Sequence, residues 1–389
     1  MIFSNGYTIG NYGSMVRDEN RTSPFARALR AAVTPDSVVL DIGTGTGFFA
    51  LLACQYGARK VFAVEPDCAI EVGKRAAVAN GYAERIQWFR AASLDIELPE
   101  RANLMISDLR GVMPLLGAHV ASIADARRRL LTPDAVLLPR RDILRMAPIE
   151  CEREYLLIAD PWERNAYGID MGAGRDYVAN SFWRAKIKAE DQLASAQTLC
   201  EIDYYSVTSP NVTGQAQWTA QRAGTMHGFC MWFDLDIGEG NGLSNAPGGP
   251  ELVYGHAFVP LLRPIDVGVG DRIEVSLQAN LVGGDYLYRW QTRIGSDDGV
   301  LKAKFSQSSF DSRPVDPTAL RMLAEDYVPQ LSQDAHFDLE ILQSMQHGLS
   351  LGAIARQLAD AHPDKFASRA AALDRVAALS RKYSTVETR

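Results

Sequence analysis

The feature that most constrains the fold of this 389-residue chain is a glycine-rich turn between a buried strand and a helix. The apolar run 37–43 predicts the strand, and the run 46–57 has the apolar spacing of a helix. Glycines in the turn let the backbone bend sharply and approach a ligand, while the helix N-terminus offers free N–H groups. A second apolar strand, 60–66, carries Glu65 near its end, where a carboxylate can accept hydrogen bonds from both hydroxyls of a ribose. The turn is therefore predicted to hold a nucleoside-type ligand.

Two classes of nucleotide cofactor bind at turns of this kind. Dinucleotide-binding turns have the spacing G-x-G-x-x-G, whereas this chain has D-x-G-x-G-x-G. The negative charge of the leading Asp41 suits a cationic ligand with an amino group and would repel a pyrophosphate. The motif favours S-adenosylmethionine over a dinucleotide, and a tight turn without a ligand is the remaining alternative. The predicted cofactor-binding residues of the motif are Asp41, Gly43, Thr44, Gly45, Gly47 and Glu65.

Three regions with different patterns follow one another along the chain. Apolar strands alternate with helices through residues 1–142, which predicts a Rossmann-like parallel sheet covered on both faces. Alternating strands with Gly, Pro, Asn and Asp turns predict an antiparallel β-barrel-like domain over 143–315, with a helical insert near 162–197. Residues 316–389 are predicted to form a C-terminal helical unit with a turn at Gly348. Its segment 337–383 resembles the winged-helix-type peptide-chaperone modules of bacterial natural-product pathways, but the favoured interpretation is a cap that packs on the barrel or on a second subunit.

Composition excludes several classes of protein. The formal net charge of −7 gives no bulk attraction to nucleic acid, and the C-terminal helices carry no basic stripe. The sequence has neither a long apolar run nor the pattern of a secretory signal, so we expect no membrane association. Five scattered cysteines without a C-x-x-C pair predict neither a metal site nor disulfides, and they fit a cytoplasmic location.

Four segments resemble the protein arginine methyltransferase family, a group of class I S-adenosylmethionine-dependent methyltransferases. Residues 15–22 (MVRDENRT) are similar to the family's N-terminal helix motif, and 130–139 to the strand that ends its nucleotide domain. Residues 226–234 are similar to a family barrel strand, and 254–257 lie where the family has its Thr-His-Trp loop.

The resemblance implies a role for several further residues. Arg21 would bind the carboxylate of the methionine moiety, Met15 would pack near the sulfonium, and Ser93 would lie on the adenine side. His256 would pair with Asp18 and either close the site or relay a proton, unless it is a structural histidine between the domains. The resemblance also implies a homodimer formed through an arm, for which the insert 162–197 is the candidate.

The acceptor loop departs from the family pattern. The family uses two glutamates after the fourth strand, and two carboxylates can grip a guanidinium from both sides. Here Asp108 takes the place of the first glutamate and Gly117 that of the second, while Arg110 adds a positive charge and Ala257 replaces the tryptophan. Asp108 is still predicted to orient the acceptor or to act as its base; the alternative is a role in capping the loop.

Together these features predict an enzyme that transfers a methyl group from S-adenosylmethionine. Because the paired acids are lost, the favoured acceptor is a small molecule with an amino or guanidino group, and the first alternative is arginine in a protein. A second alternative is a non-catalytic protein that binds S-adenosylmethionine and a peptide. The predicted catalytic residues are Asp108, His256 and Asp18, with no metal.

Overall fold

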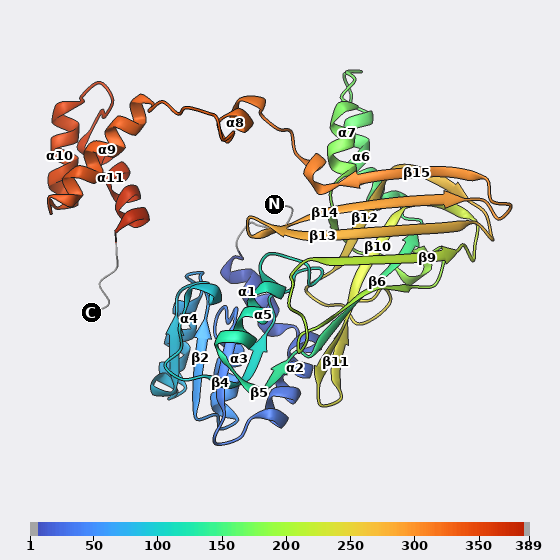
Figure 1. Cartoon of the computed structure of the whole chain (residues 1–389), viewed down its shortest axis with the longest axis horizontal. Helices are drawn as coiled ribbons and strands as arrows, with labels where there is room; N and C mark the ends of the chain where they lie inside the picture. Colours follow the sequence, from blue (N-terminus) through green and yellow to red (C-terminus); the bar gives the residue numbers. More distant parts are fainter. Residues whose placement is uncertain (1–6, 385–389) are drawn as a thin grey trace. The chain divides into compact units, whose positions relative to one another are not determined.

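The computed structural model describes residues 7–384 (Figure 1). The chain divides into two compact units, Met1–Pro314 and Val315–Arg389. The first unit contains a parallel sheet followed by antiparallel sheets, as the sequence predicts for a Rossmann-like domain and a barrel-like domain. No helix among the described residues is long and apolar enough to span a membrane.

The parallel sheet has the strand order β3-β2-β1-β4-β5. Its strands are continuous apolar runs because helices cover both faces; all five residues of β1 are buried, for example. The order reverses at β1, which pairs with β2 on one side and with β4 on the other, and ligands of such sheets bind at the carboxyl ends of the strands beside this point. The elements are α1 (Ile9–Arg17), α2 (Glu19–Ala32), β1 (Val38–Ile42), α3 (Phe48–Gln55), β2 (Lys60–Val64), α4 (Ile70–Ala79), β3 (Ile86–Phe89), β4 (Ala102–Ser107), α5 (His119–Arg129) and β5 (Leu131–Leu138), with short 3-10 helices η1 (Ala83–Arg85) and η2 (Ser93–Asp95).

Two antiparallel sheets follow. The first has the order β7-β12-β10-β6-β8, with β11 paired to β10, and the second has the order β15-β14-β13-β9. Exposed and buried residues alternate along β13 and β14, so one face of the second sheet packs inward, where Trp290 is only 1% exposed. The strands are β6 (Arg141–Ile149), β7 (Trp183–Ala185), β8 (Gln197–Asp203), β9 (Val212–Thr219), β10 (Gly224–Gly238), β11 (Asn241–Ser244), β12 (His256–Val267), β13 (Arg272–Val282), β14 (Asp285–Gly295) and β15 (Leu301–Ser308), with 3-10 helices η3 (Ala189–Asp191) and η4 (Ser309–Ser312).

The helical insert differs from its predicted limits of 162–197. It consists of α6 (Glu152–Glu163) and α7 (Ala173–Ala179), and the chain is already back in the sheet at β7. Figure 1 shows the two helices standing out from the barrel sheets as an arm. The early start was missed because 155–158 is a short continuous apolar run, which fits a buried strand as well as a helix.

The second unit contains α8 (Pro317–Arg321), α9 (Gln333–Gln346), α10 (Leu351–Ala361) and α11 (Arg369–Tyr383). A serine caps each of the last three helices by accepting a hydrogen bond from the backbone N–H three residues further on. These helices share a small core of their own. No strand occurs within 315–384, so the described part of the unit lacks the β-wing of a winged helix. The core residues are Phe337, Ile341, Ile354, Ala355, Leu358, Phe366, Ala372 and Val376.

Candidate active site

The glycine-rich turn lies between β1 and α3 at the carboxyl edge of the parallel sheet. Gly43, Gly45 and Gly47 have φ of +73°, +54° and +81°, a backbone conformation that side chains disfavour. A Cβ added to Gly45 would lie 2.7 Å from a ring carbon of Tyr12. The glycines therefore permit both the turn itself and the close approach of α1 to it.

Two buried carboxylates flank the turn. Asp41 accepts a 2.6 Å hydrogen bond from the Thr44 hydroxyl, and burial raises its pKa to about 7. Glu65 accepts from the backbone N–H groups of Gly45 at 3.0 Å and Asp67 at 2.9 Å, and burial raises its pKa as well. Neither carboxylate has an ion-pair partner among the described residues, so together they favour a ligand that brings a cation or hydroxyl donors.

Two tyrosines that the sequence does not predict as site residues lie near the turn, Tyr12 on α1 and Tyr7 just before that helix. Tyr12 packs its ring over Gly45, and Tyr7 meets Tyr12 edge-on at 5.7 Å between ring centroids. Burial and the nearby Glu65 raise the pKa of Tyr12. Tyr12 is half-buried, but no residue of α1 is fully buried, so the helix covers the turn without belonging to the core. The available signal in the sequence was the pair of aromatic residues just before Met15.

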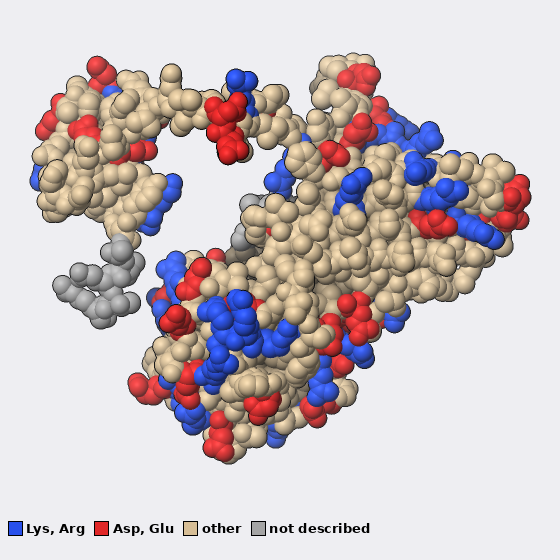
Figure 2. Space-filling model, viewed as in Figure 1, with Lys and Arg blue, Asp and Glu red and all other residues tan. Residues whose placement is uncertain are grey.

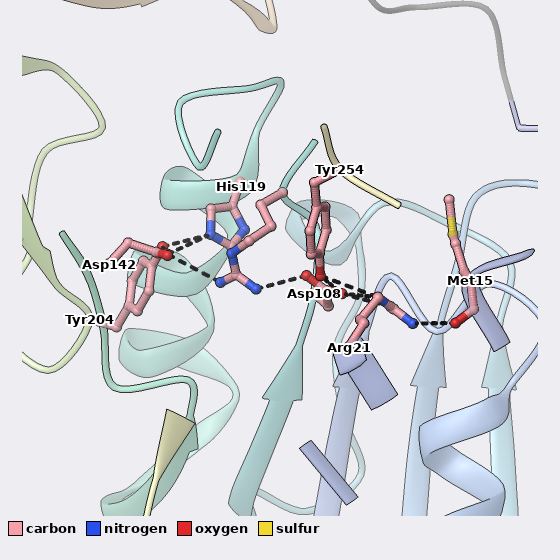
Figure 3. Close-up of polar contacts among 8 residues, drawn as sticks. Met15, Arg21, Asp108, His119, Asp142, Tyr204 and Tyr254 are labelled. Atoms are coloured by element: carbon pink, nitrogen blue, oxygen red, sulfur yellow. Dashed lines mark hydrogen bonds and ion pairs between the residues drawn. The ribbon is translucent and has the colours of Figure 1, made fainter. Parts of the chain in front are cut away.

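Arg21 joins the N-terminal helices to the acceptor loop (Figure 3). Its Nε donates to Asp108 Oδ2 at 2.7 Å, its Nη2 lies 2.6 Å from the same oxygen, and its Nη1 donates to the Met15 carbonyl at 3.2 Å. The structure thus brings Asp108 to Arg21, 87 residues away in the sequence, while Met15 is a near neighbour of Arg21 in the chain.

Asp108, in the loop after β4, has both carboxylate oxygens engaged. Oδ2 accepts from Arg21 and, at 2.7 Å, from the Tyr254 hydroxyl, while Oδ1 accepts from Arg110 Nη1 at 2.7 Å. Burial acts to raise the pKa of Asp108, but Arg21 and Arg110 outweigh it and hold that pKa below its usual range. Asp108 is therefore an ionised carboxylate with both oxygens hydrogen-bonded, and no pattern in the sequence predicts its contact with Tyr254.

Arg110 points inward, the orientation in which its charge opposes a cationic acceptor. Its side chain is 0% exposed and its Nη2 donates to Asp142 Oδ2 at 3.2 Å. The Tyr204 hydroxyl donates to the same oxygen of Asp142, and His119 Nε2 lies 2.7 Å from that hydroxyl. Burial and the nearby Arg110 lower the pKa of His119 far below its usual value, so the imidazole is neutral. Figure 3 shows the contacts that link Asp108 with Asp142, Tyr204 and His119.

The predicted pair between His256 and Asp18 is not formed. Asp18 is the N-cap of α2, where its carboxylate accepts from the backbone N–H of Arg21 at 3.1 Å and, through Oδ2, from that of Val253 at 2.8 Å. His256 Nδ1 instead accepts from the backbone N–H of Ile187 at 3.0 Å, and burial lowers the pKa of His256. Asp18 still joins α2 to the loop before β12, but through the backbone.

The two remaining positions named from the sequence are Ser93 and Gly117. Ser93 is buried at the start of η2, where its carbonyl accepts a hydrogen bond from Arg129 Nη2 at 3.2 Å. Gly117 has a φ of +50° with open space at the position of a Cβ, and as a glycine it offers no carboxylate beside Asp108. Within 7–384 there is no group of three or more His, Cys, Asp or Glu residues arranged to hold a metal ion.

Comparisons with known proteins agree with this geometry. Residues 141–279 match the family model of the arginine methyltransferase oligomerization subdomain, and residues 21–122 match that of the ribosomal protein L11 methyltransferase. The chain is 29% identical over 238 residues to a probable protein arginine N-methyltransferase 6 of Arabidopsis thaliana, covering 59% of this chain and 54% of that protein. It is 28% identical to protein arginine N-methyltransferase 2 of Mus musculus, covering 66% of this chain and 61% of that protein. The matches thus span little more than half the length of these relatives.

A solved structure shows the same fold. The PRMT1 enzyme-prozyme heterotetrameric complex of Trypanosoma brucei with AdoHcy superimposes with a TM-score of 0.70 at 21% identity, covering 77% of this chain and 98% of that chain. The sheet order, the glycine-rich turn and the acid after β2 define the class I methyltransferase fold. More particularly, with its barrel-like domain in series, the chain is arginine methyltransferase-like.

Proposed function

We propose that this protein transfers a methyl group from S-adenosylmethionine to a nucleophilic acceptor. The observation that carries the proposal is the pair of buried carboxylates, Asp41 and Glu65, on either side of a left-handed glycine turn at the point where the strand order reverses. A solved structure with the same fold holds AdoHcy, the demethylated form of this cofactor.

The residues at the turn fit such a cofactor. Glu65 would accept from the ribose hydroxyls, and Asp41 would favour the amino group, because burial leaves the charge of each carboxylate poorly stabilised. Arg21 would bind the methionine carboxylate; its Nη1 contacts the Met15 carbonyl, and the ring of Tyr12 lies over Gly45 of the turn. Bound S-adenosylmethionine would supply an electrophilic methyl group on a cationic sulfonium, so the protein's main task is to position the acceptor and exclude water.

For the acceptor, we propose the guanidinium of an arginine in a protein. The relatives matched are named protein arginine N-methyltransferases, and this favours the protein acceptor over the small molecule that the sequence first suggested. A second candidate is an uncharged amine. It is favoured by one observation, namely that Arg21, Arg110 and Tyr254 already use both oxygens of Asp108.

Mass spectrometry distinguishes the acceptors. The protein is incubated with S-adenosylmethionine and, separately, with an arginine-rich peptide, free arginine or a metabolite extract. A methylated peptide supports the first candidate, and methylation of an extract component alone supports the second. Bound cofactor without transfer to any of them would instead support the non-catalytic alternative. Glu65→Gln is the control, because its loss of ribose contacts should abolish every transfer.

We also propose a homodimer formed through the arm of α6 and α7. The arm lies within the segment that matches the oligomerization subdomain, and it carries apolar side chains that are exposed in the single chain. Leu157→Glu is expected to give a monomer in light scattering, because Leu157 is 62% exposed on α6. Val282→Glu is the matched control, since Val282 is 61% exposed at the end of β13, outside the arm. A monomeric wild-type protein at micromolar concentration would contradict the proposal.

The predicted cytoplasmic location stays a prediction that rests on the cysteines. All five are free, and those with a resolved shift have a raised pKa because they are buried. Figure 2 shows both acidic and basic side chains on this face of the first unit.

A further inference from the structure

The acceptor loop already contains a guanidinium, that of Arg110. Two carboxylates hold it from different parts of the first unit: Asp108 follows β4 of the parallel sheet, and Asp142 lies on β6 of the barrel. They bind adjacent nitrogens of Arg110, Nη1 at 2.7 Å and Nη2 at 3.2 Å. The guanidinium carbon also lies 5.6 Å from the ring centroid of Phe233, within the range of a cation–π contact.

This arrangement has the chemistry of a binding site for a guanidinium ion. Planar guanidinium groups are recognised by carboxylates that meet several N–H groups at once, and aromatic faces add to the attraction. Gly117 stands at the position of the second acid in the acceptor loop, whereas Asp142 offers a second carboxylate from the barrel. The site is next to Arg21 and Met15, the residues expected at the methionine end of the cofactor.

The fit of Arg110 is incomplete. Arg110 Nε and Asp142 Oδ1 are both buried without a hydrogen-bond partner within residues 7–384. Leaving buried polar atoms unpaired is unfavourable. Because Asp142 Oδ1 has no partner, Arg110 does not use the full bonding capacity of the two carboxylates. A guanidinium that arrives from outside is free to adjust its orientation and to use Asp142 Oδ1 as well, which the short tether of Arg110 prevents.

We infer that Asp108 and Asp142 form the guanidinium-binding pair of this protein, and that Arg110 occupies the pair as a built-in competitor of the acceptor. Arg110 is then a specificity-determining residue. An arginine acceptor enters by displacing it, and an acceptor without a cation does not need to. The role of Arg110 as a competitor rests on the proposed function, because it presupposes an acceptor. Binding of a guanidinium ion by the two carboxylates is measurable without methyl transfer.

The test is chemical rescue of Arg110→Ala in the full-length protein. The probes are N-ethylguanidinium and its uncharged analogue N-ethylurea, followed by calorimetry and thermal unfolding. The variant is expected to bind N-ethylguanidinium, with an unfolding temperature that rises with its concentration, and not to respond to N-ethylurea. The wild-type protein should show neither binding nor a rise. Arg110→Ala with Asp142→Asn should bind at least about tenfold more weakly, because a charge-assisted contact is lost.

Several results would overturn the inference. One is a folded Arg110→Ala variant that binds both probes equally or neither, and another is binding that is unchanged by Asp142→Asn. If the variant does not fold alone, refolding yield decides: a higher yield in N-ethylguanidinium than in N-ethylurea supports the pair, and equal yields refute it.

A kinetic assay separates this inference from the proposed function. If arginine is the acceptor, Arg110→Ala should lower the KM for an arginine peptide relative to the wild type, and an unchanged KM would contradict the competitor role. Rescue by N-ethylguanidinium with no transfer to arginine by either protein would reject the arginine acceptor and leave the binding pair standing.

Discussion

Asp41 should make cofactor binding depend on pH, and its burial sets the size of the effect. Burial raises the pKa of this carboxyl from 3.8 to about 7. Ionising Asp41 is therefore less favourable in the folded protein than in the unfolded chain, by on the order of 4 kcal/mol. Because the folded-state pKa is the higher one, the empty protein binds more protons than the unfolded chain between these pH values, and its stability falls as the pH rises through them. A ligand amino group beside Asp41 favours the ionised carboxylate, so binding below pH 7 must release a proton.

The expected result is a Kd for S-adenosylhomocysteine that rises by about tenfold per pH unit below pH 7 and is nearly constant above it. Isothermal titration in buffers of different ionisation enthalpy measures both the affinity and the proton released. Asp41→Asn should abolish the slope and weaken binding at pH 8. It should also stabilise the empty protein at that pH by about 1–3 kcal/mol, since it removes a buried charge but weakens the Thr44 contact.

Glu65→Gln serves as the control for this prediction, because burial also raises the pKa of Glu65. The slope should persist in this variant, although the affinity falls. A Kd that does not change between pH 6 and pH 8 in the wild type would refute the reasoning. A slope that persists in Asp41→Asn and vanishes in Glu65→Gln would assign the proton to the other carboxylate.

Further predictions follow from single contacts. Gly45→Ala should weaken binding of S-adenosylhomocysteine and lower the stability by about 1–2 kcal/mol, because its φ is +54° and the new Cβ would meet Tyr12; unchanged affinity and unfolding temperature would contradict this. Tyr12→Ala should weaken binding but hardly change thermal unfolding, because α1 buries none of its residues; a large fall in unfolding temperature would place α1 in the core instead. Trp290→Ala should cost about 3–5 kcal/mol in chemical denaturation, since this side chain is 1% exposed; a smaller loss would mean that the barrel core relaxes into the gap. A chain that ends at Pro314 should keep its cofactor affinity in calorimetry, because 315–389 has a core of its own; a loss would show that the second unit supports the site.

The part of the site that was predicted from the sequence is the part that local order along the chain determines. Asp41 and Glu65 each occupy the end of a buried strand in a parallel sheet, so their places at one edge follow from the strand pattern alone. Asp108 could be placed for the same reason, because it follows β4 directly.

The contacts of Asp108 and His256 could not be predicted in this way. They depend on which side chains of the barrel meet the parallel sheet, and that is decided by packing between segments far apart in the chain. Asp142 is the second residue of β6, and no pattern in the sequence marks it as buried, yet it is 0% exposed and binds Arg110. His256 follows the predicted loop pattern, but Ile187 donates to it and Asp18 is used as a helix cap.

The central claim, methyl transfer from S-adenosylmethionine, is tested most directly by following S-adenosylhomocysteine formation and acceptor mass together. The purified protein is given S-adenosylmethionine and an arginine-rich peptide, with Glu65→Gln in parallel. We predict that the wild-type protein forms S-adenosylhomocysteine and adds methyl groups to arginine in the peptide, and that the variant does neither. Tight binding of S-adenosylmethionine with no product from the peptide, free arginine or a metabolite extract would contradict the account.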